Sequence, residues 1–177
     1  PVILLENLWL YQVKEEVPEK MYALPLDKAR VAQEGTDVTV VTYGDGFVDS
    51  LSALTLLPKD ISVELIDLVS INPVDYDTIE QSVRKTGRLI TVDTTNAAFS
   101  VGAEIIAKMT ERAIPLSSTP IAIATPDVPV PTSSALLEFY YPTKVDIANA
   151  VLKMLNKEAL ETKLSFEELH LAPSHTL

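Results

Sequence analysis

The stretch Glu34–Gly44, EGTDVTVVTYG, decides the fold of this chain. It begins as a polar turn, continues as a run rich in β-branched residues and stops at a glycine. A short apolar run between turn residues is typical of a strand that is buried on both faces of a sheet. Phe47, Leu51 and Leu54 follow at helical spacing, and Pro58 ends that helix. The stretch therefore predicts a buried strand that leads into a helix.

The same alternation of strand and helix continues along the chain. Strands are predicted over Val38–Tyr43, Ile61–Leu68, Leu89–Val92 and Ile121–Ala124. Further helices are predicted around Ile79–Val83, Val101–Met109 and Ile147–Leu155. At the first of these we expect Asp77 to be the N-cap, Glu80 to complete a capping box and Gly87 to end the helix. Thr143 and Asp146 give the same capping signal at the last helix. Such alternation implies an α/β fold with a mostly parallel sheet covered on both faces.

We expect three parts along the chain. Residues 1–33 are interpreted as an interdomain linker or arm, residues 34–157 as the domain, and residues 158–177 as a charged tail. The opening run Val2–Leu5 is strand-like with nothing before it to pair with, which is typical of a cut through a larger protein. Residues 125–142 form a long loop with four prolines. Loops of this length in compact domains are usually functional or at an interface.

The composition excludes several kinds of site. The chain has 177 residues, 25 acids against 14 bases, and a net charge of −11. This balance argues against nucleic acid and anionic membranes as partners, because both need clustered positive charge. The absence of cysteine excludes disulfides, thiolate catalysis and cysteine-ligated zinc. No apolar run approaches the roughly 20 residues of a membrane-spanning helix. We expect a protein of the cytoplasm, or of the mitochondrial matrix in a eukaryote.

The turn Gly44-Asp45-Gly46 is the most cofactor-like motif. It lies between a strand and a helix, where backbone N–H groups can bind phosphate. It also matches the start of the thiamine diphosphate motif, with Asn72 at about the expected distance. That motif has paired asparagines, however, and Pro73 follows Asn72. We therefore favour a plain glycine turn with Asp45 as the helix N-cap.

Other candidate sites rest on acids and histidines. Asp67 and Asp93 are expected at neighbouring strand ends, where open α/β sheets bind ligands, and with Asp45 they could bind a cation or a basic side chain. Glu104 lies near the start of its predicted helix. It either stabilises the N-terminus of that helix by its negative charge or is a buried acid. The only histidines, His170 and His175, lie in the tail, so the domain itself cannot form a Ser-His-Asp triad.

The end of the proline-rich loop carries three consecutive aromatic residues. Alternation cannot place all of Phe139-Tyr140-Tyr141 inward, so at least one should be exposed or buried against another chain, since aromatic residues are enriched in interface cores. An interface role and a core role both remain open. The candidate interface residues are Asp127, Val128, Val130, Phe139, Tyr140 and Tyr141.

Five blocks of sequence occur in the order found in one protein family. They are Glu34–Gly44, Ser62–Asp75, Thr78–Ile90, Val101–Ile105 and Pro126–Pro131. With the flanking segments, the match spans roughly Pro1–Leu155. On these blocks the chain resembles the C-terminal domain of the beta subunit of thiamine-diphosphate-dependent 2-oxo acid dehydrogenases.

The resemblance implies a fold, partners and a division of labour. It implies a three-layer α/β/α domain with a five-stranded mixed sheet of the transketolase C-terminal type. In the family, thiamine diphosphate and magnesium sit between two other domains, so the resemblance implies no catalytic, cofactor-binding or metal-binding residues in this chain. It implies association with an alpha subunit and a second beta subunit, and docking to the acyltransferase core through its subunit-binding domain.

Two other interpretations remain open from the sequence. The chain could be a free-standing interaction module of the same fold. It could also bind a small ligand or cation through the strand-end carboxylates Asp45, Asp67 and Asp93.

Overall fold

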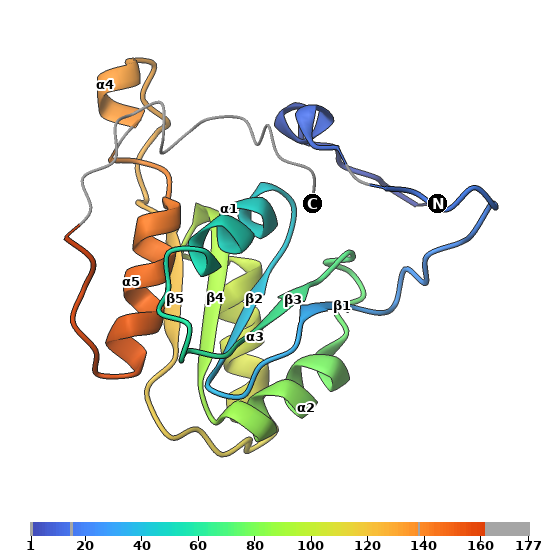
Figure 1. The fold of residues 1–177 in the computed structure, drawn as a ribbon. Helices are drawn as coiled ribbons and strands as arrows, with labels where there is room; N and C mark the ends of the chain where they lie inside the picture. Colours follow the sequence, from blue (N-terminus) through green and yellow to red (C-terminus); the bar gives the residue numbers. More distant parts are fainter. Residues whose placement is uncertain (1, 15, 138, 162–177) are drawn as a thin grey trace.

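A computed structural model describes residues 2–14, 16–137 and 139–161 of the chain. Five strands form one sheet in the order β1-β3-β2-β4-β5 (Figure 1). Their bounds are β1 Arg30–Gln33, β2 Val38–Thr42, β3 Val63–Asp67, β4 Leu89–Asn96 and β5 Ile121–Thr125. Strands β2 to β5 are parallel, and β1 pairs with β3 in the antiparallel direction.

Helices cover both faces of this sheet (Figure 1). The main helices are α1 Asp45–Leu54, α2 Tyr76–Thr86, α3 Val101–Glu111 and α5 Lys144–Met154. Helices α1 and α5 cover one face around a buried cluster that includes Val40 and Ile147. Helices α2 and α3 cover the other face around a cluster that includes Val41 and Ile105. The expected three-layer α/β/α fold with a five-stranded mixed sheet is confirmed.

The helix ends agree with the expected signals in part. Gly87 ends α2 with a left-handed φ of 68°, as expected for a glycine C-cap. Thr143 and Asp146 form the expected capping box at α5. The N-cap of α2 is Asp75 rather than Asp77, because the Asp75 carboxylate accepts the backbone N–H of Thr78 at 3.2 Å. The sequence placed this helix start two positions too late.

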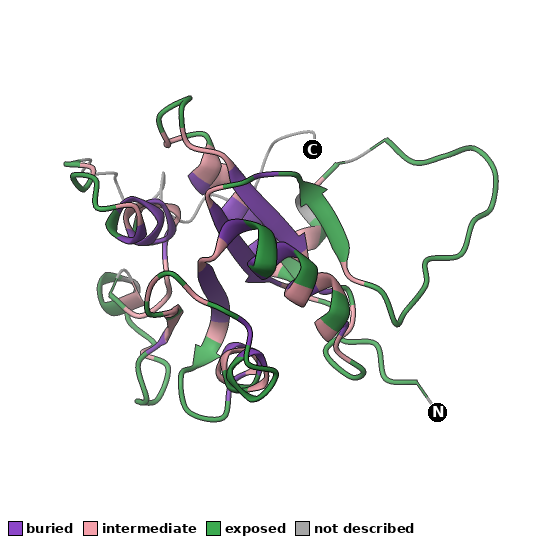
Figure 2. Ribbon diagram, turned by 90° about the horizontal axis from the view of Figure 1, so that it is seen from below, coloured by how far each residue is buried: buried purple, intermediate pink, exposed green. Residues whose placement is uncertain are grey.

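The residue pattern did not locate β1, the fifth strand of the sheet that the family resemblance implies. It lies within residues 1–33, which we interpreted as a linker, so the sheet includes part of that segment. All four β1 residues are exposed, whereas β2 and β3 beside it are buried (Figure 2). An exposed edge strand has no apolar alternation, and this explains why the pattern was missed. Arg30 in β1 forms an ion pair with Asp67 in β3 at 3.2 Å.

Strand β4 is longer than expected. The prediction ended it at Val92, but it continues to Asn96 through a polar run. Its last residues, Thr95 and Asn96, are exposed, so only the first part shows the apolar signature of a buried strand. Asp93 therefore lies inside the strand and is only 2% exposed.

The remaining helices, η1 and α4, are short. Before β1 lies a five-residue 3₁₀ helix, η1 (Leu8–Gln12), within an extended arm that projects from the body (Figure 1). The proline-rich loop contains a short helix, α4 (Ser134–Leu137). Within the part of the chain that the structure describes, no helix is long and apolar enough to cross a membrane.

Candidate interface at the ends of β4 and β5

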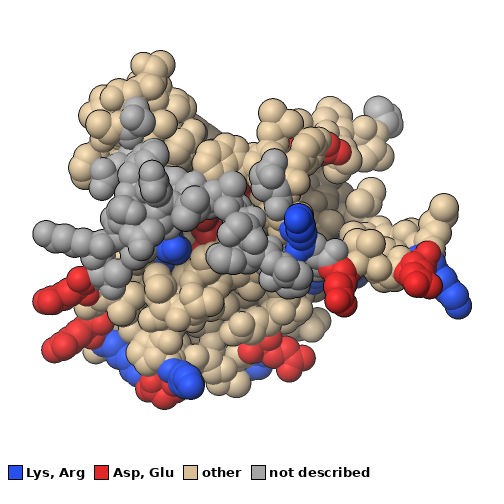
Figure 3. Space-filling view, turned by 45° about the horizontal axis from the view of Figure 1, so that its top comes forward, with Lys and Arg blue, Asp and Glu red and all other residues tan. Residues whose placement is uncertain are grey.

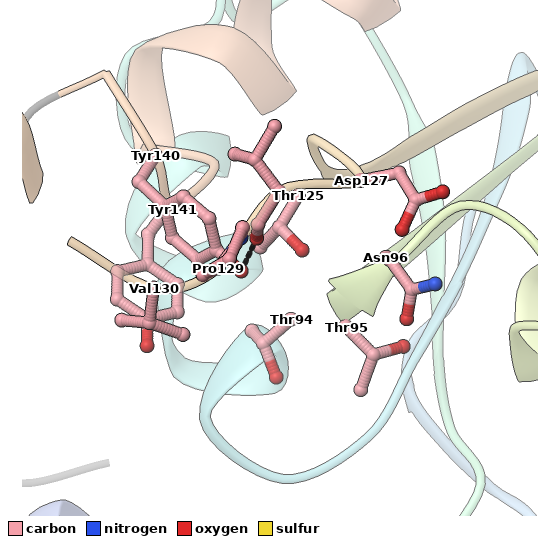
Figure 4. A pocket seen from close by; sticks show the side chains of 10 residues that line it. Thr94, Thr95, Asn96, Thr125, Asp127, Pro129, Val130, Tyr140 and Tyr141 are labelled. Carbon is pink, nitrogen blue, oxygen red and sulfur yellow. Dashed lines mark hydrogen bonds between the residues drawn. The ribbon is translucent and has the colours of Figure 1, made fainter.

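The carboxyl ends of β4 and β5 open into a surface hollow of about 510 Å³. The register of the two strands shifts between Val92 and Asn96, and Asn96 then lies opposite Thr125. The hollow is lined by residues from the end of β4, the end of β5, the proline-rich loop and the tyrosines before α5 (Figure 4). The lining residues are Thr94, Thr95, Asn96, Thr125, Asp127, Val128, Pro129, Val130, Tyr140 and Tyr141. Ligand sites of open α/β sheets lie at such strand ends.

The wall of the hollow is held by local contacts within the loop. The Tyr140 hydroxyl donates to the carbonyl oxygen of Val128 at 3.2 Å, so the tyrosine ties the loop to its own base (Figure 4). The rings of Tyr140 and Tyr141 stand edge to face with centroids 4.9 Å apart. The backbone N–H of Tyr140 donates to the carbonyl of Leu137, the last residue of α4. The loop is therefore an ordered rim with two aromatic rings at its base.

The rim is apolar although it faces water. Val128, Val130 and Leu136 are each more than half exposed, and Phe139 is 80% exposed. In Figure 3 the described side chains around α4 have the tan colour of residues other than Lys, Arg, Asp and Glu. Apolar side chains gathered on an exposed surface are typical of an interaction site.

Five of the six candidate interface residues line this one hollow. They are Asp127, Val128, Val130, Tyr140 and Tyr141. Phe139 lies outside the lining but on the same rim, three residues after Leu136. The sequence did not identify the floor of the hollow, Thr94 to Asn96. Its signal was the polar run that follows Val92, beyond the predicted end of the strand.

The turn Gly44-Asp45-Gly46 lies beside the hollow but carries negative charge. Asp45 accepts a hydrogen bond from the Thr94 hydroxyl at 3.3 Å, and the N-cap of α1 is Gly44 rather than Asp45. Burial, followed by repulsion from Asp45, raises the pKa of Asp49 to about 6, while Lys144 acts in the opposite direction. A phosphate at this turn would meet two carboxylates, so the turn does not fit a diphosphate group.

The three carboxylates of the proposed cation site do not converge. Asp67 ends β3 and Asp93 lies in β4, and β2 stands between these strands, so the expectation of neighbouring strand ends is wrong. Each acid has its own partners. Asp67 accepts from Arg30 and from the backbone N–H of Val69, at 3.2 and 3.3 Å. Across residues 2–14, 16–137 and 139–161, no three acidic or histidine side chains are grouped as metal ligands would be.

The Asp93 carboxylate is held by hydrogen bonds from other parts of the domain. Its two oxygens accept from the Tyr43 hydroxyl at 2.5 Å and from the Gly102 backbone N–H at 2.7 Å. Burial, followed by the hydrogen bond to Asp93, raises the pKa of Tyr43 far above its ordinary value. The carboxylate therefore joins the end of β2, the middle of β4 and the first turn of α3.

Glu104 is not among the residues that line the hollow. Glu104 is exposed on α3, near its N-terminus, and accepts from the Tyr76 hydroxyl at 3.2 Å. His170 and His175 lie outside the described residues.

Comparison with known proteins assigns residues 27–147 to the family model "Transketolase, C-terminal domain". The pyruvate dehydrogenase E1 component subunit beta of Staphylococcus aureus is 40% identical over 164 residues, which covers 91% of this chain and 49% of the relative. The corresponding subunit of Bacillus subtilis is 39% identical over 158 residues, covering 88% of this chain and 48% of the relative. The chain thus spans about half the length of the curated relatives it matches.

A solved structure is also similar. It is described as a split-gene transketolase, an inactive beta4 tetramer. It superposes with a TM-score of 0.66 at 27% identity, over 79% of this chain and 47% of that one. The fold and the sequence thus lead to the same kind of domain.

Proposed function

We propose, since this chain belongs to the family of transketolase C-terminal domains, that it is the non-catalytic C-terminal domain of a 2-oxo acid dehydrogenase beta subunit. The parent reaction would be oxidative decarboxylation of a 2-oxo acid such as pyruvate, with acyl transfer to a lipoyl group. Sequence identity of 40% to a pyruvate dehydrogenase beta subunit over nearly the whole chain supports this assignment. The expected location is the cytoplasm, or the mitochondrial matrix in a eukaryote.

The domain serves assembly rather than chemistry in this proposal. Thiamine diphosphate and magnesium belong to the parent enzyme, and the one cofactor-like turn in this chain presents Asp45 and Asp49 where a diphosphate would need positive charge or free N–H groups. The partners are an alpha subunit and a second beta subunit. The acyltransferase core, through its subunit-binding domain, is a third.

The hollow at the ends of β4 and β5 is the feature that supports the assembly proposal. It joins an apolar, exposed rim to two ordered tyrosine rings, and apolar side chains around aromatic anchors are what an interface core requires. Its floor adds hydroxyl and amide groups that a partner can use for hydrogen bonds. The similar solved structure is itself described as a tetramer, which is compatible with a role in subunit contacts.

A chimera tests this role. The C-terminal half of the Bacillus subtilis beta subunit is replaced by this chain, and the product is co-expressed with its alpha subunit. We expect the two subunits to co-purify, and Val130→Asp at the rim to weaken that association at least tenfold. Ala107→Asp, an exposed position on α3, is the matched control and should leave it unchanged. Equal association of both variants would contradict an interface at the hollow.

Calorimetry tests the absence of cofactor binding. The 177-residue chain is titrated with thiamine diphosphate in the presence of magnesium, and we expect no saturable heat. Saturable binding with one site per chain would show that the domain holds the cofactor itself.

A further inference from the structure

Arg112 of this domain is held by an aromatic ring and by carboxylates at the same time. It follows α3 directly, and its guanidinium lies over the Tyr76 ring at 5.5 Å from the centroid. The same guanidinium pairs with Asp77 and Glu80 of α2, at 2.8 Å each. A guanidinium suits such a site, because its flat face stacks on a ring while its edge donates hydrogen bonds to oxygen atoms.

Arg30 in β1 repeats this arrangement on the other face of the sheet. Its guanidinium lies over the Phe47 ring of α1 at 4.9 Å from the centroid. It also pairs with Asp67 of β3 at 3.2 Å. In two separate places, therefore, this domain binds a guanidinium with an aromatic ring beside a carboxylate.

The hollow at the ends of β4 and β5 has the rings and the carboxylate but no arginine. Asp127 is the one charged residue of its lining, which also includes Tyr140 and Tyr141. The Val128 N–H donates to the Pro126 carbonyl at 2.9 Å, so Asp127 is the middle residue of a tight turn. The Tyr140 hydroxyl donates to the Val128 carbonyl at 3.2 Å, which ties this ring to the same turn.

Two oxygen acceptors of the hollow can take a further donor. Among the described residues, none donates a hydrogen bond to the Asp127 carboxylate. The Asn96 amide gives its NH₂ group to the Ala98 carbonyl at 3.4 Å, and its oxygen remains as an acceptor. Figure 4 shows Asp127 and Asn96 on one side of the hollow and the two tyrosines on the other. A side chain that enters between them meets oxygen atoms on one side and aromatic rings on the other.

The charge around the hollow favours a cation. Asp45, outside the lining, accepts from the Thr94 hydroxyl at 3.3 Å, and Asp49 lies one turn further along α1. Lys144 acts on Asp49 but does not line the hollow, and the whole chain carries a net charge of −11. A hollow of about 510 Å³ has the size of a small-ligand pocket, so it has room for a guanidinium and its stem.

We propose that this hollow binds an arginine side chain of the alpha subunit, with its guanidinium paired to Asp127 and stacked on the tyrosine rings. The inference rests on the proposed function, in which the hollow contributes to association with that subunit. A lysine would supply the charge but neither the flat face nor the forked donors. An apolar side chain would leave the carboxylate without a partner at the interface.

A titration with small analogues of arginine tests the site on the 177-residue chain. The probe is N-acetyl-arginine amide, and its matched control is N-acetyl-citrulline amide, which has nearly the same shape but a neutral urea group. Backbone NMR signals of Thr94, Asn96 and Asp127 report binding. We expect saturable shifts with the arginine probe and at least tenfold weaker binding of the citrulline probe. Equal binding of the two probes, or no saturable shift with the arginine probe, would overturn the proposal.

Two variants locate the binding on the chain. Asp127→Asn should lower the affinity for the arginine probe at least fivefold, because the amide keeps the size of the side chain but removes its charge. Asp27→Asn is the matched control, since Asp27 is also an exposed acid and lies outside the lining, and it should leave the affinity unchanged. An equal loss in both variants would show attraction by overall charge alone and would overturn the pairing with Asp127.

The chimera with the Bacillus subtilis alpha subunit separates this inference from the proposed function. We expect Asp127→Asn in the chimera to weaken the association at least fivefold and to reduce its salt dependence. If Val130→Asp weakens the association and Asp127→Asn does not, the arginine is overturned and the interface stands. If the chimera does not associate at all, the proposed function fails together with the alpha subunit as the source of the arginine, and the probe titration alone decides whether the hollow binds a guanidinium.

Discussion

We expect removal of the Asp93 carboxylate to destabilise the domain more than removal of any other carboxylate described above. In Asp93→Ala, the Tyr43 hydroxyl and the Gly102 N–H lose their acceptor. A hydrogen bond to a charged acceptor contributes about 1.5–3 kcal/mol, and a buried donor without a partner bears the full cost of its desolvation. Tyr43 is only half-buried and can turn toward water, whereas the Gly102 N–H cannot.

These contributions predict a loss of about 3–4 kcal/mol in the free energy of unfolding, or roughly 6–16 °C in Tm for a chain of this size. Asp93→Asn should lose less, about 1–2 kcal/mol, because the amide oxygen can accept from Gly102 while its NH₂ group donates to the tyrosine oxygen. Stability that rises from Asp93→Ala to Asp93→Asn to the unmodified protein would indicate that this carboxylate acts through its hydrogen bonds.

Urea unfolding at pH 7, followed by circular dichroism, measures these changes. Asp67→Asn is the control, since its ion pair with Arg30 lies at the surface and should change stability by less than about 1 kcal/mol. A loss below about 1 kcal/mol in Asp93→Ala would refute the structural assignment of this carboxylate. A rise in Tm on adding magnesium or calcium, lost in Asp93→Ala, would instead restore the cation-site interpretation.

Four further substitutions have defined outcomes. The folded-state pKa of Asp49 is raised to about 6 from 3.8, so the folded state retains a proton between about pH 4 and 6 and stability falls as pH rises through that window. Asp49→Asn should therefore flatten the pH profile and stabilise the domain by about 1–3 kcal/mol at pH 7, as measured by Tm across pH. Gly35→Ala places a Cβ 2.2 Å from a backbone carbon of β3 and should cost at least about 2 kcal/mol, whereas Gly44→Ala meets no atom within 4 Å and bears only the cost of its φ of +59°, about 1 kcal/mol. Equal losses in the two would contradict the close approach at Gly35. Thr143→Ala removes the α5 cap and should lower the free energy of unfolding by about 1 kcal/mol in urea titrations, and no loss would show that the cap is dispensable.

The buried part of the fold could be predicted from the sequence. Strand β2 is buried at all five positions and reads as a continuous apolar and β-branched run, so burial and pattern agree. Two kinds of helix terminus could be predicted as well. One has a glycine in the left-handed region, such as Gly87, and the other has a side-chain cap, such as Thr143. These features depend on local chemistry, which a sequence displays directly.

The features that depend on pairing could not be predicted in this way. Strand β1 is exposed at every position and exists because β3 offers it a partner. The end of β4 is polar because it forms the floor of the hollow, so it resembles a loop. The strand order separates Asp67 from Asp93, and no spacing along the chain reveals that order. The candidate interface was easier to predict, because prolines and aromatic residues on a long loop are unusual wherever the loop lies.

The sheet divides the apolar interior into two compartments. The cluster under α1 and α5 and the cluster under α2 and α3 lie on opposite faces of the sheet. Changes at distant, unconnected sites add their effects on stability. Random mutation behind α2 and α3 can therefore accumulate, or be corrected, without altering the shape of the hollow at the ends of β4 and β5. Such a domain can drift in its stability while its contacts with other chains stay the same.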